Sequence, residues 1–395
     1  MFSINKKISL GTALGIAILA VTVSIAITMS VVNNSYNDVL KDLPEKIDRY
    51  SSLDEIAALV DSDFYGSMNK ENVNSAIAKG FIDGLKDKYS VYMSADKYKT
   101  YLDESRGNMT GIGIEYSKRS DGYINVDRVY SDSPASSAGL KKDDLIVAFD
   151  GVSLNQDNYD EMSEKLTGDK LTSVNITFRH GTTEKTVNVV KGYEAKSVNF
   201  LSENSIGYIS ISNFYSTTAT QVEDALNKLE NKVKGIVVDL RDTSSTNIDE
   251  ALKTLDLFIP MVEGANGIAT LEDEKGNVIR TFTSTSGAVN IPLVIIVNSK
   301  TSGAAEFLAC ELRDFDKASI VGQKTRGNGL VQEIFPLTDG SAVKLSVGKI
   351  IPYRSTPYHG TGILPDKECE TDSGKEIYED PAYLCAAAFF DDTSE

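Results

Sequence analysis

Apolar and polar positions along the chain follow three successive patterns. From residue 35 to about residue 104, apolar side chains recur every three or four residues, which predicts amphipathic helices. From residue 111 to about residue 191, short runs of alternating apolar and polar residues lie between Gly, Asp and Ser turns, which predicts strands. The helical spacing is clear at Leu53, Ile56, Leu59, Ile77, Phe81 and Leu85, and the alternation is clear at residues 174–178.

The third pattern begins at residue 206 and consists of short, continuously apolar runs. They lie at residues 235–240, 293–297 and 318–322, and stretches with helical spacing separate them, at residues 218–229, 249–258 and 304–315. Strands that are apolar throughout are buried on both faces, and their alternation with helices is typical of a parallel sheet. The sequence therefore predicts a mixed α/β fold with a βαβ core after a strand-rich block.

The N-terminal region carries a membrane signal. Residues 8–32 hold no charged side chain over 25 positions, enough to cross a hydrocarbon core of about 30 Å. Lys6 and Lys7 precede this run, and positive charge tends to stay in the cytoplasm. We therefore expect a cytoplasmic tail at residues 1–7, a single signal anchor and an extracytoplasmic remainder. A cleaved signal peptide is the alternative, although no A-x-A-like cleavage site precedes Asn33.

The amino-acid composition excludes several classes of partner and site. Lys and Arg total 40 against 57 Asp and Glu, a formal charge of −17 that argues against a nucleic-acid partner. Two histidines and three cysteines, without a C-x-x-C or H-E-x-x-H motif, predict no metal site and no cofactor. Cys369 and Cys385 could pair outside the cytoplasm. Free buried thiols remain open for all three cysteines, Cys310 included.

The strand-rich block resembles a PDZ domain. The run SPASSAGLKKDDLI at residues 133–146, continuing to Asp150 and Gly151, carries the resemblance. It implies that the glycines near residue 111 let backbone N–H groups meet a terminal carboxylate, while the adjacent strand edge accepts an extended peptide. The alternative for the apolar helix face is simple core packing. The expected peptide-binding residues are Gly111, Ile112, Gly113 and Ile114 in the loop and strand, and Tyr159, Met162 and Leu166 on a facing helix.

From about residue 45 to about residue 367 the chain resembles the C-terminal processing peptidases, also called tail-specific proteases. Motifs that carry the resemblance lie at residues 87–93, 206–211, 239–241, 321–325, 327–332 and 360–366. The resemblance implies a PDZ domain joined to a ClpP/crotonase-like protease core. The implied divisions are a helical region at 33–107, the PDZ domain at 108–192, the core at 193–367 and an acidic, partly helical tail at 368–395.

Active members of this family use a serine nucleophile in a T-x-S-x-x-E run and a lysine base in a G-K-G-x-V-Q run. In this chain the matching positions hold Gly303 and Asn328, and only the supporting Gln332 remains. A glycine has no side-chain atom to attack a carbonyl, and an amide has no useful basicity near pH 7. The glycine-rich turn of the family is also missing, because residues 242–246 read Asp-Thr-Ser-Ser-Thr.

These departures predict a catalytically degenerate protein that binds protein C-termini through its PDZ groove, as a scaffold or regulator. One alternative is an active endopeptidase with a displaced dyad formed by Ser302 and Lys324. A third possibility is an assembly protein with a vestigial groove. Expected partners are C-terminal peptides, the membrane, and a second copy or an active relative.

Overall fold

A computed structural model describes residue 29 and residues 43–109, 111–130, 133–166, 172–261, 267–285, 289–372 and 375–391. The chain divides into two compact units, Met1–Asn74 and Ser75–Glu395. Except for Met29, the predicted anchor at residues 8–32 lies outside the described residues. Among the residues that are described, no helix combines the length and apolar character needed to cross a bilayer.

Helices dominate the chain before residue 110, as the spacing of apolar residues predicts. A short strand interrupts them and pairs with a strand of the distant core, so this region is not purely helical. The elements are α2 (Leu43–Asp63), α3 (Lys70–Asp83), β1 (Val91–Met93), α4 (Ala95–Ser105) and β2 (Asn108–Met109).

The block predicted to be strand-rich forms an antiparallel sheet with the order β3-β4-β5-β7-β8, and β6 pairs with β5. Strand β3 pairs only with β4 in this sheet, so its other edge is free of strand partners among the described residues. The elements are β3 (Ile114–Lys118), β4 (Ile124–Val129), α5 (Pro134–Ser137), β5 (Leu145–Phe149), β6 (Val152–Ser153), α6 (Tyr159–Glu164), β7 (Ser173–His180) and β8 (Thr183–Val190).

The core holds a six-stranded sheet with the order β10-β11-β12-β16-β18-β21, in which all neighbours are parallel except β10 and β11. Every residue of β12 and β16 is buried, because both faces of the sheet are covered. This confirms the predicted βαβ arrangement. The strands are β10 (Val198–Glu203), β11 (Ile206–Ile211), β12 (Gly235–Asp239), β16 (Leu293–Val297), β18 (Ala318–Gly322) and β21 (Lys367–Glu368).

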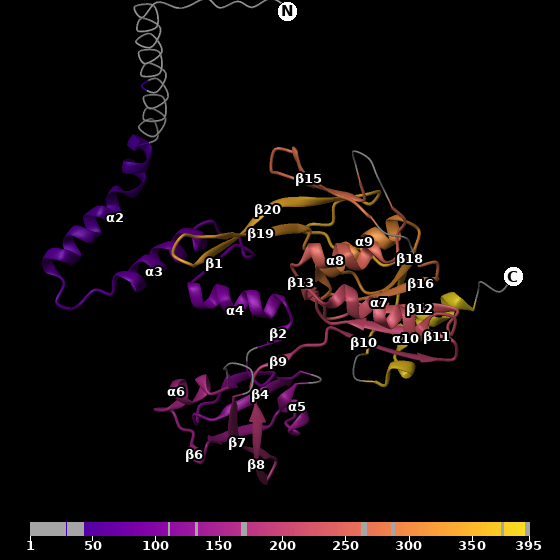
Figure 1. Ribbon diagram of the computed structural model, residues 1–395, viewed down its shortest axis with the longest axis horizontal. Helices are drawn as coiled ribbons and strands as arrows, with labels where there is room; N and C mark the ends of the chain where they lie inside the picture. The colour runs from indigo at the N-terminus through magenta and orange to yellow at the C-terminus, as the bar shows by residue number, and fades with distance from the viewer. Residues whose placement is uncertain are drawn as a thin grey trace, which may run out of the picture. The chain divides into compact units, whose positions relative to one another are not determined.

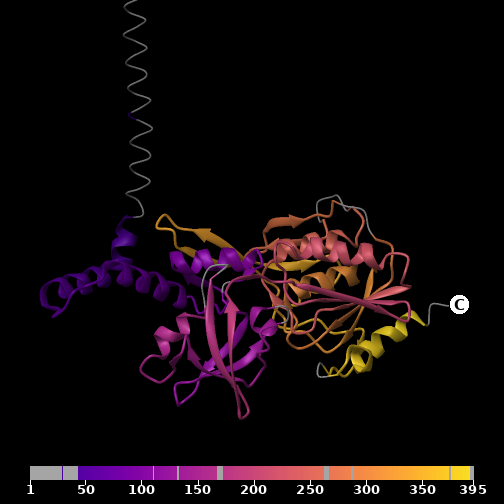
Figure 2. The same cartoon turned by 60° about the horizontal axis from the view of Figure 1, so that its bottom comes forward.

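Alternate residues of each strand face different helices, as the period of two requires. Ile236 and Val238 pack with three helices on one face, whereas Val237 packs with α10 on the other (Figures 1 and 2). The helices are α7 (Thr218–Leu229), α8 (Ile248–Asp256), α9 (Ala304–Asp314) and α10 (Pro381–Ala387), with short 3-10 turns at η1 (Ile377–Glu379) and η2 (Ala388–Phe390).

A second, antiparallel sheet is built around the long strand β20, which pairs with β1, β14 and β19. Two small pairings complete the described strands, β2 with β9 and β13 with β17. The remaining strands are β9 (Tyr193–Glu194), β13 (Ser244–Ser245), β14 (Ala269–Glu272), β15 (Val278–Phe282), β17 (Ser302–Gly303), β19 (Leu330–Pro336) and β20 (Ala342–Pro352).

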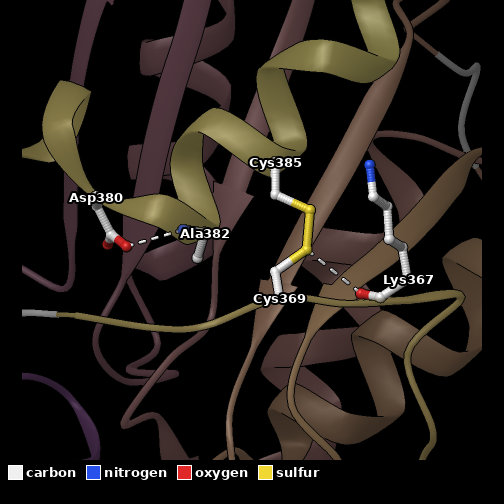
Figure 3. The surroundings of a disulfide bond; sticks show 5 residues. All are labelled: Lys367, Cys369, Asp380, Ala382 and Cys385. Atoms are coloured by element: carbon white, nitrogen blue, oxygen red, sulfur yellow. Dashed lines mark hydrogen bonds between the residues drawn. A yellow bond between two sulfur atoms is a disulfide. The ribbon is translucent and has the colours of Figure 1, made fainter.

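A disulfide between Cys369 and Cys385 joins the segment after β21 to α10 (Figure 3). The two Cα atoms are 6.5 Å apart, and the residues are separated by 16 positions in the chain. Helix α10 packs against β12, β16 and β18, so the bond attaches the cover of one sheet face to the sheet edge. Of the two possibilities left open by the sequence, the structure has the pairing, and Cys310 is free and buried.

Replacing both Cys369 and Cys385 by Ser should lower the free energy of unfolding by about 3 kcal/mol. Without the bond, the unfolded chain is no longer restricted by a closed loop of this size, so its conformational entropy rises. Urea unfolding followed by circular dichroism measures the change. The wild-type protein in reductant should match the variant. Equal stability of the oxidised wild type and the variant would contradict the role given to this bond.

Candidate functional site

Gly303 occupies the junction between β17 and α9, where the chain turns from strand to helix. Its backbone has φ +65° and ψ −114°, in a region that side-chain-bearing residues rarely adopt. Its N–H donates to Glu306 Oε2 at 3.0 Å, which satisfies one of the free donors at the start of α9. The position that matches the family's nucleophile therefore lies at a helix N-terminus, in a turn that glycine adopts but that a residue with a side chain would strain.

Glu306 connects this turn to the loop that follows β18. Its carboxylate is fully buried, and it accepts four hydrogen bonds. Oε2 receives the N–H groups of Gly303 at 3.0 Å and Asn328 at 2.7 Å. Oε1 receives the Gly327 N–H at 2.6 Å and the Thr325 hydroxyl at 2.5 Å. One oxygen thus fixes the backbone at both positions that match the family's dyad.

The side chain of Asn328 lies beside Gly303. Its Nδ2 is 3.5 Å from the point that a Cβ on Gly303 would occupy, and the residue is only 3% exposed. Its Oδ1 is buried and has no hydrogen-bond partner among the described residues. The structure therefore brings together the two positions that the sequence motifs single out, one without a side chain and one with an amide.

Gln332 lies on β19 and has a similar buried amide. Its Nε2 donates to the Leu330 carbonyl at 3.1 Å and to Ser346 Oγ at 3.4 Å. Its Oε1, like Asn328 Oδ1, is buried without a partner in the described part of the chain. In the same part of the chain, no group of three or more His, Cys, Asp and Glu residues could hold a metal ion.

Residues 242–246, which lack the family's glycines, lie beside Gly303. Strand β13 pairs in parallel with β17, with Ser245 opposite Gly303, and the Ser302 N–H donates to the Thr243 carbonyl at 2.9 Å. As a result, the Ser245 carbonyl oxygen is 2.2 Å from the Cβ position of Gly303. The missing glycines are visible in the sequence, but this close approach is not, because it joins backbones 58 residues apart.

The residues of the suggested displaced dyad differ in their surroundings. Ser302 is 3% exposed within β17, whereas Lys324 is exposed to solvent. Within the described residues, no hydrogen bond links Ser302 to Lys324. A lysine that acts as a base needs partial desolvation, which an exposed side chain lacks. The surroundings of Lys324 therefore do not favour a role as a base.

The loop before β3 has the geometry of an anion-binding turn. Gly111 and Gly113 have φ values of +91° and +83°, which glycine adopts without strain. The carbonyls of Gly111, Ile112 and Gly113 accept backbone N–H groups from Gly192, Ala135 and Tyr130, at 2.7, 2.9 and 3.0 Å. Among the described residues, the N–H groups of residues 111–113 donate to no group, and successive N–H groups in such a turn can together bind an anion.

The predicted groove residues are largely buried in the core of this domain. Tyr159, Met162 and Leu166 are 9%, 8% and 2% exposed, and they share one hydrophobic cluster with Ile112. Ile114 is half-buried at the start of β3 and packs against the same cluster. Core packing therefore accounts for most of the apolar surface of α6. Contact between these predicted groove residues and a peptide remains a prediction.

A PDZ-type domain followed by a parallel α/β core defines a class of two-domain peptidase folds. Residues 110–190 match the PDZ domain family, and residues 205–369 match peptidase family S41. These matches assign the two segments to those families, in line with the resemblance that the sequence motifs predict.

Related proteins extend the match along most of the chain. One from Staphylococcus haemolyticus, named "Probable CtpA-like serine protease", is 29% identical over 92% of this chain and 74% of its own length. One of the same name from Staphylococcus aureus strain MRSA252 is 30% identical over 81% of this chain and 65% of its own length.

Two solved structures share the fold. An S41 protease structure from Bacteroides fragilis aligns with a TM-score of 0.53 and 17% identity, over 85% of this chain and 93% of that chain. The photosystem II D1 C-terminal processing protease aligns with a TM-score of 0.50 and 20% identity, over 80% of this chain and 86% of that chain. At these identities the likeness concerns the fold alone.

Replacing Gly303 by Ser should lower the free energy of unfolding by about 3 kcal/mol or more, because strained backbone and a clash with the Ser245 carbonyl add together. Gly276→Ser is the matched control. Gly276 also has a positive φ, +82°, but nothing lies within 4 Å of its Cβ position.

The control should lose only about 1 kcal/mol, the cost of the backbone conformation alone. Urea unfolding of the two variants beside the wild type measures both changes. An equal loss in the two variants would show that the Ser245 carbonyl does not obstruct this position.

Proposed function

We propose that this chain is a membrane-anchored, extracytoplasmic pseudoprotease of the family, which binds protein C-termini through its PDZ domain and acts as a scaffold or regulator. The observation that carries the proposal is the closed space at Gly303. The Cβ atom of a serine there would lie 2.2 Å from the Ser245 carbonyl oxygen, which is closer than non-bonded atoms approach in folded proteins. The chain thus lacks both the nucleophile and the room for one.

The base position supports the same conclusion. The Asn328 amide is held beside Gly303, where the family has a lysine, and an amide nitrogen neither accepts a proton near neutral pH nor activates a hydroxyl. If only the nucleophile were lost, the remaining base would have no hydroxyl to deprotonate. Loss of both, together with the closed turn at residues 242–246, is what we expect after selection for hydrolysis has ceased.

The binding role is supported by the loop at residues 111–113. Three successive N–H groups without partners among the described residues can each donate to a carboxylate oxygen, and hydrogen bonds to a charged acceptor are strong. The adjacent edge of β3 has no strand neighbour in the described part of the chain, so an extended peptide can add to the sheet there.

Sequence and disulfide together support the proposed location. Residues 8–32 are long and apolar enough for a membrane span, and Lys6 and Lys7 favour a cytoplasmic N-terminus. The Cys369–Cys385 bond suits an oxidising compartment, because disulfides rarely persist in the cytosol. The partners we propose are C-terminal peptides and either a second copy or an active family relative.

A second candidate is an active serine endopeptidase, which is favoured by the names of the relatives. It requires Ser302 and Lys324 to act as a displaced dyad. The burial of Ser302 and the exposure of Lys324 count against it, since a nucleophile must reach substrate and a lysine base must be desolvated.

Peptide binding by the full-length chain, purified in a mild detergent, tests the proposed function. A fluorescent octapeptide with a free C-terminal carboxylate should bind at least about tenfold more tightly than its C-terminal amide, because the amide loses charge-assisted hydrogen bonds. Fluorescence anisotropy gives the two dissociation constants. Mass spectrometry after incubation should find the peptide intact.

The loop assignment has a matched pair of variants. Gly113→Ala should weaken binding, because its Cβ would lie 2.3 Å from Ser133 Cβ and would displace the loop. Gly151→Ala in the same domain, with a similar φ of +81° and nothing within 4 Å, should leave binding unchanged. Equal affinity for the carboxylate and the amide would rule out the carboxylate loop.

A further inference from the structure

Lys118 forms a cation–π contact at one end of the expected peptide-binding groove of the PDZ domain. Its ammonium nitrogen lies 4.2 Å from the centre of the Tyr159 ring, a cation–π distance. Lys118 is the last residue of β3 and Tyr159 the first residue of α6, so the contact places the end of the strand beside the start of the helix. The opposite end of this groove is then the end near the loop at residues 111–113.

The alternation of side chains along β3 decides which residues face the helix. Lys118 shares its face with Ile114 and Tyr116, because residues two apart point to the same side of a strand. Glu115 lies on the other face and pairs there with Arg128, at 3.7 Å. Lys118 is therefore the one charged residue that β3 presents to the groove.

The ammonium of Lys118 has no carboxylate partner within the described residues. The acidic residues of α6 (Asp160, Glu161 and Glu164) are exposed, and none forms an ion pair with it. The neighbouring Lys165 is paired with Asp150, at 3.0 Å. Lys118 is thus a positive charge that is positioned on an aromatic ring and is still available to a ligand.

The direction of an added strand determines which ligand residues reach this charge. A peptide that adds antiparallel to β3, with its carboxylate at residues 111–113, places its last residue beside Ile114. Its third residue from the end then lies beside Tyr116 and its fifth beside Lys118. Both of these side chains face the groove, whereas that of the fourth residue faces away.

We propose that Lys118 makes the groove selective for C-terminal peptides with an acidic side chain at the third or fifth position from the end. The proposal rests on the proposed function, since it requires that the groove bind a C-terminal peptide. Lys118 is a specificity-determining residue in this arrangement, and Tyr159 is the platform that positions its ammonium.

The experiment compares octapeptides that differ by one residue, Glu or Gln, at the third, fourth or fifth position from the end. Fluorescence anisotropy with the full-length chain at low salt should show Glu binding about two- to fivefold more tightly than Gln at the third or fifth position. The preference should weaken as salt is raised, and it should be absent at the fourth position. Lys118→Met should remove it, whereas Lys142→Met, at an exposed lysine of the same domain, should not.

The outcomes separate this inference from the proposed function. Equal binding of Glu and Gln peptides at every position, with the carboxylate still preferred over the amide, overturns the role of Lys118 alone. A Glu preference that survives Lys118→Met also overturns it. Loss of the difference between carboxylate and amide overturns the proposed function itself, and the selectivity at Lys118 with it.

Discussion

The buried carboxylate of Glu306 is the interaction on which the centre of the core depends. It accepts four hydrogen bonds, two on each oxygen: Oε2 accepts the N–H groups of Gly303 and Asn328, and Oε1 accepts the Gly327 N–H and the Thr325 hydroxyl. A buried carboxylate that loses its hydrogen bonds destabilises the folded state, so these four groups are held together around it. The backbone at the two positions that match the family's dyad is therefore held in place, with Gly303 at one and Asn328 at the other.

The three differences from the family's motifs lie together in the structure. Gly303 permits the turn at the start of α9 and leaves space that the Ser245 carbonyl occupies. Asn328 adds an amide beside it, with an oxygen that has no partner among the described residues. Because Ser244 and Ser245 pair with β17, a serine at position 303 would collide with the Ser245 carbonyl. If the proposed function is correct, we expect that restoring the two dyad residues alone would not give a working site, because the Ser245 carbonyl would still obstruct position 303.

Much of this could be predicted from the sequence. The continuously apolar runs at residues 235–240 and 293–297 indicate strands buried on both faces, and both lie at the centre of the parallel sheet. The motif spacing indicates that positions 303 and 328 are neighbours, as the structure shows. The approach of the Ser245 carbonyl could not be predicted, because it depends on strand pairing between distant segments. The Lys118–Tyr159 contact likewise depends on how a helix packs beside a strand edge, which residue patterns do not specify.

Under the proposed function, binding and catalysis are separate in this chain, because the PDZ loop offers N–H donors whereas Gly303 and Asn328 occupy the positions that match the family's dyad. Degradation of unfolded, fluorescently labelled casein by the full-length protein is the most direct test of that separation. We expect release of fluorescent fragments at the rate of the protein-free blank, for the wild type and for Ser302→Ala alike. Release above the blank that Ser302→Ala abolishes would contradict a degenerate centre and would make Ser302 the nucleophile.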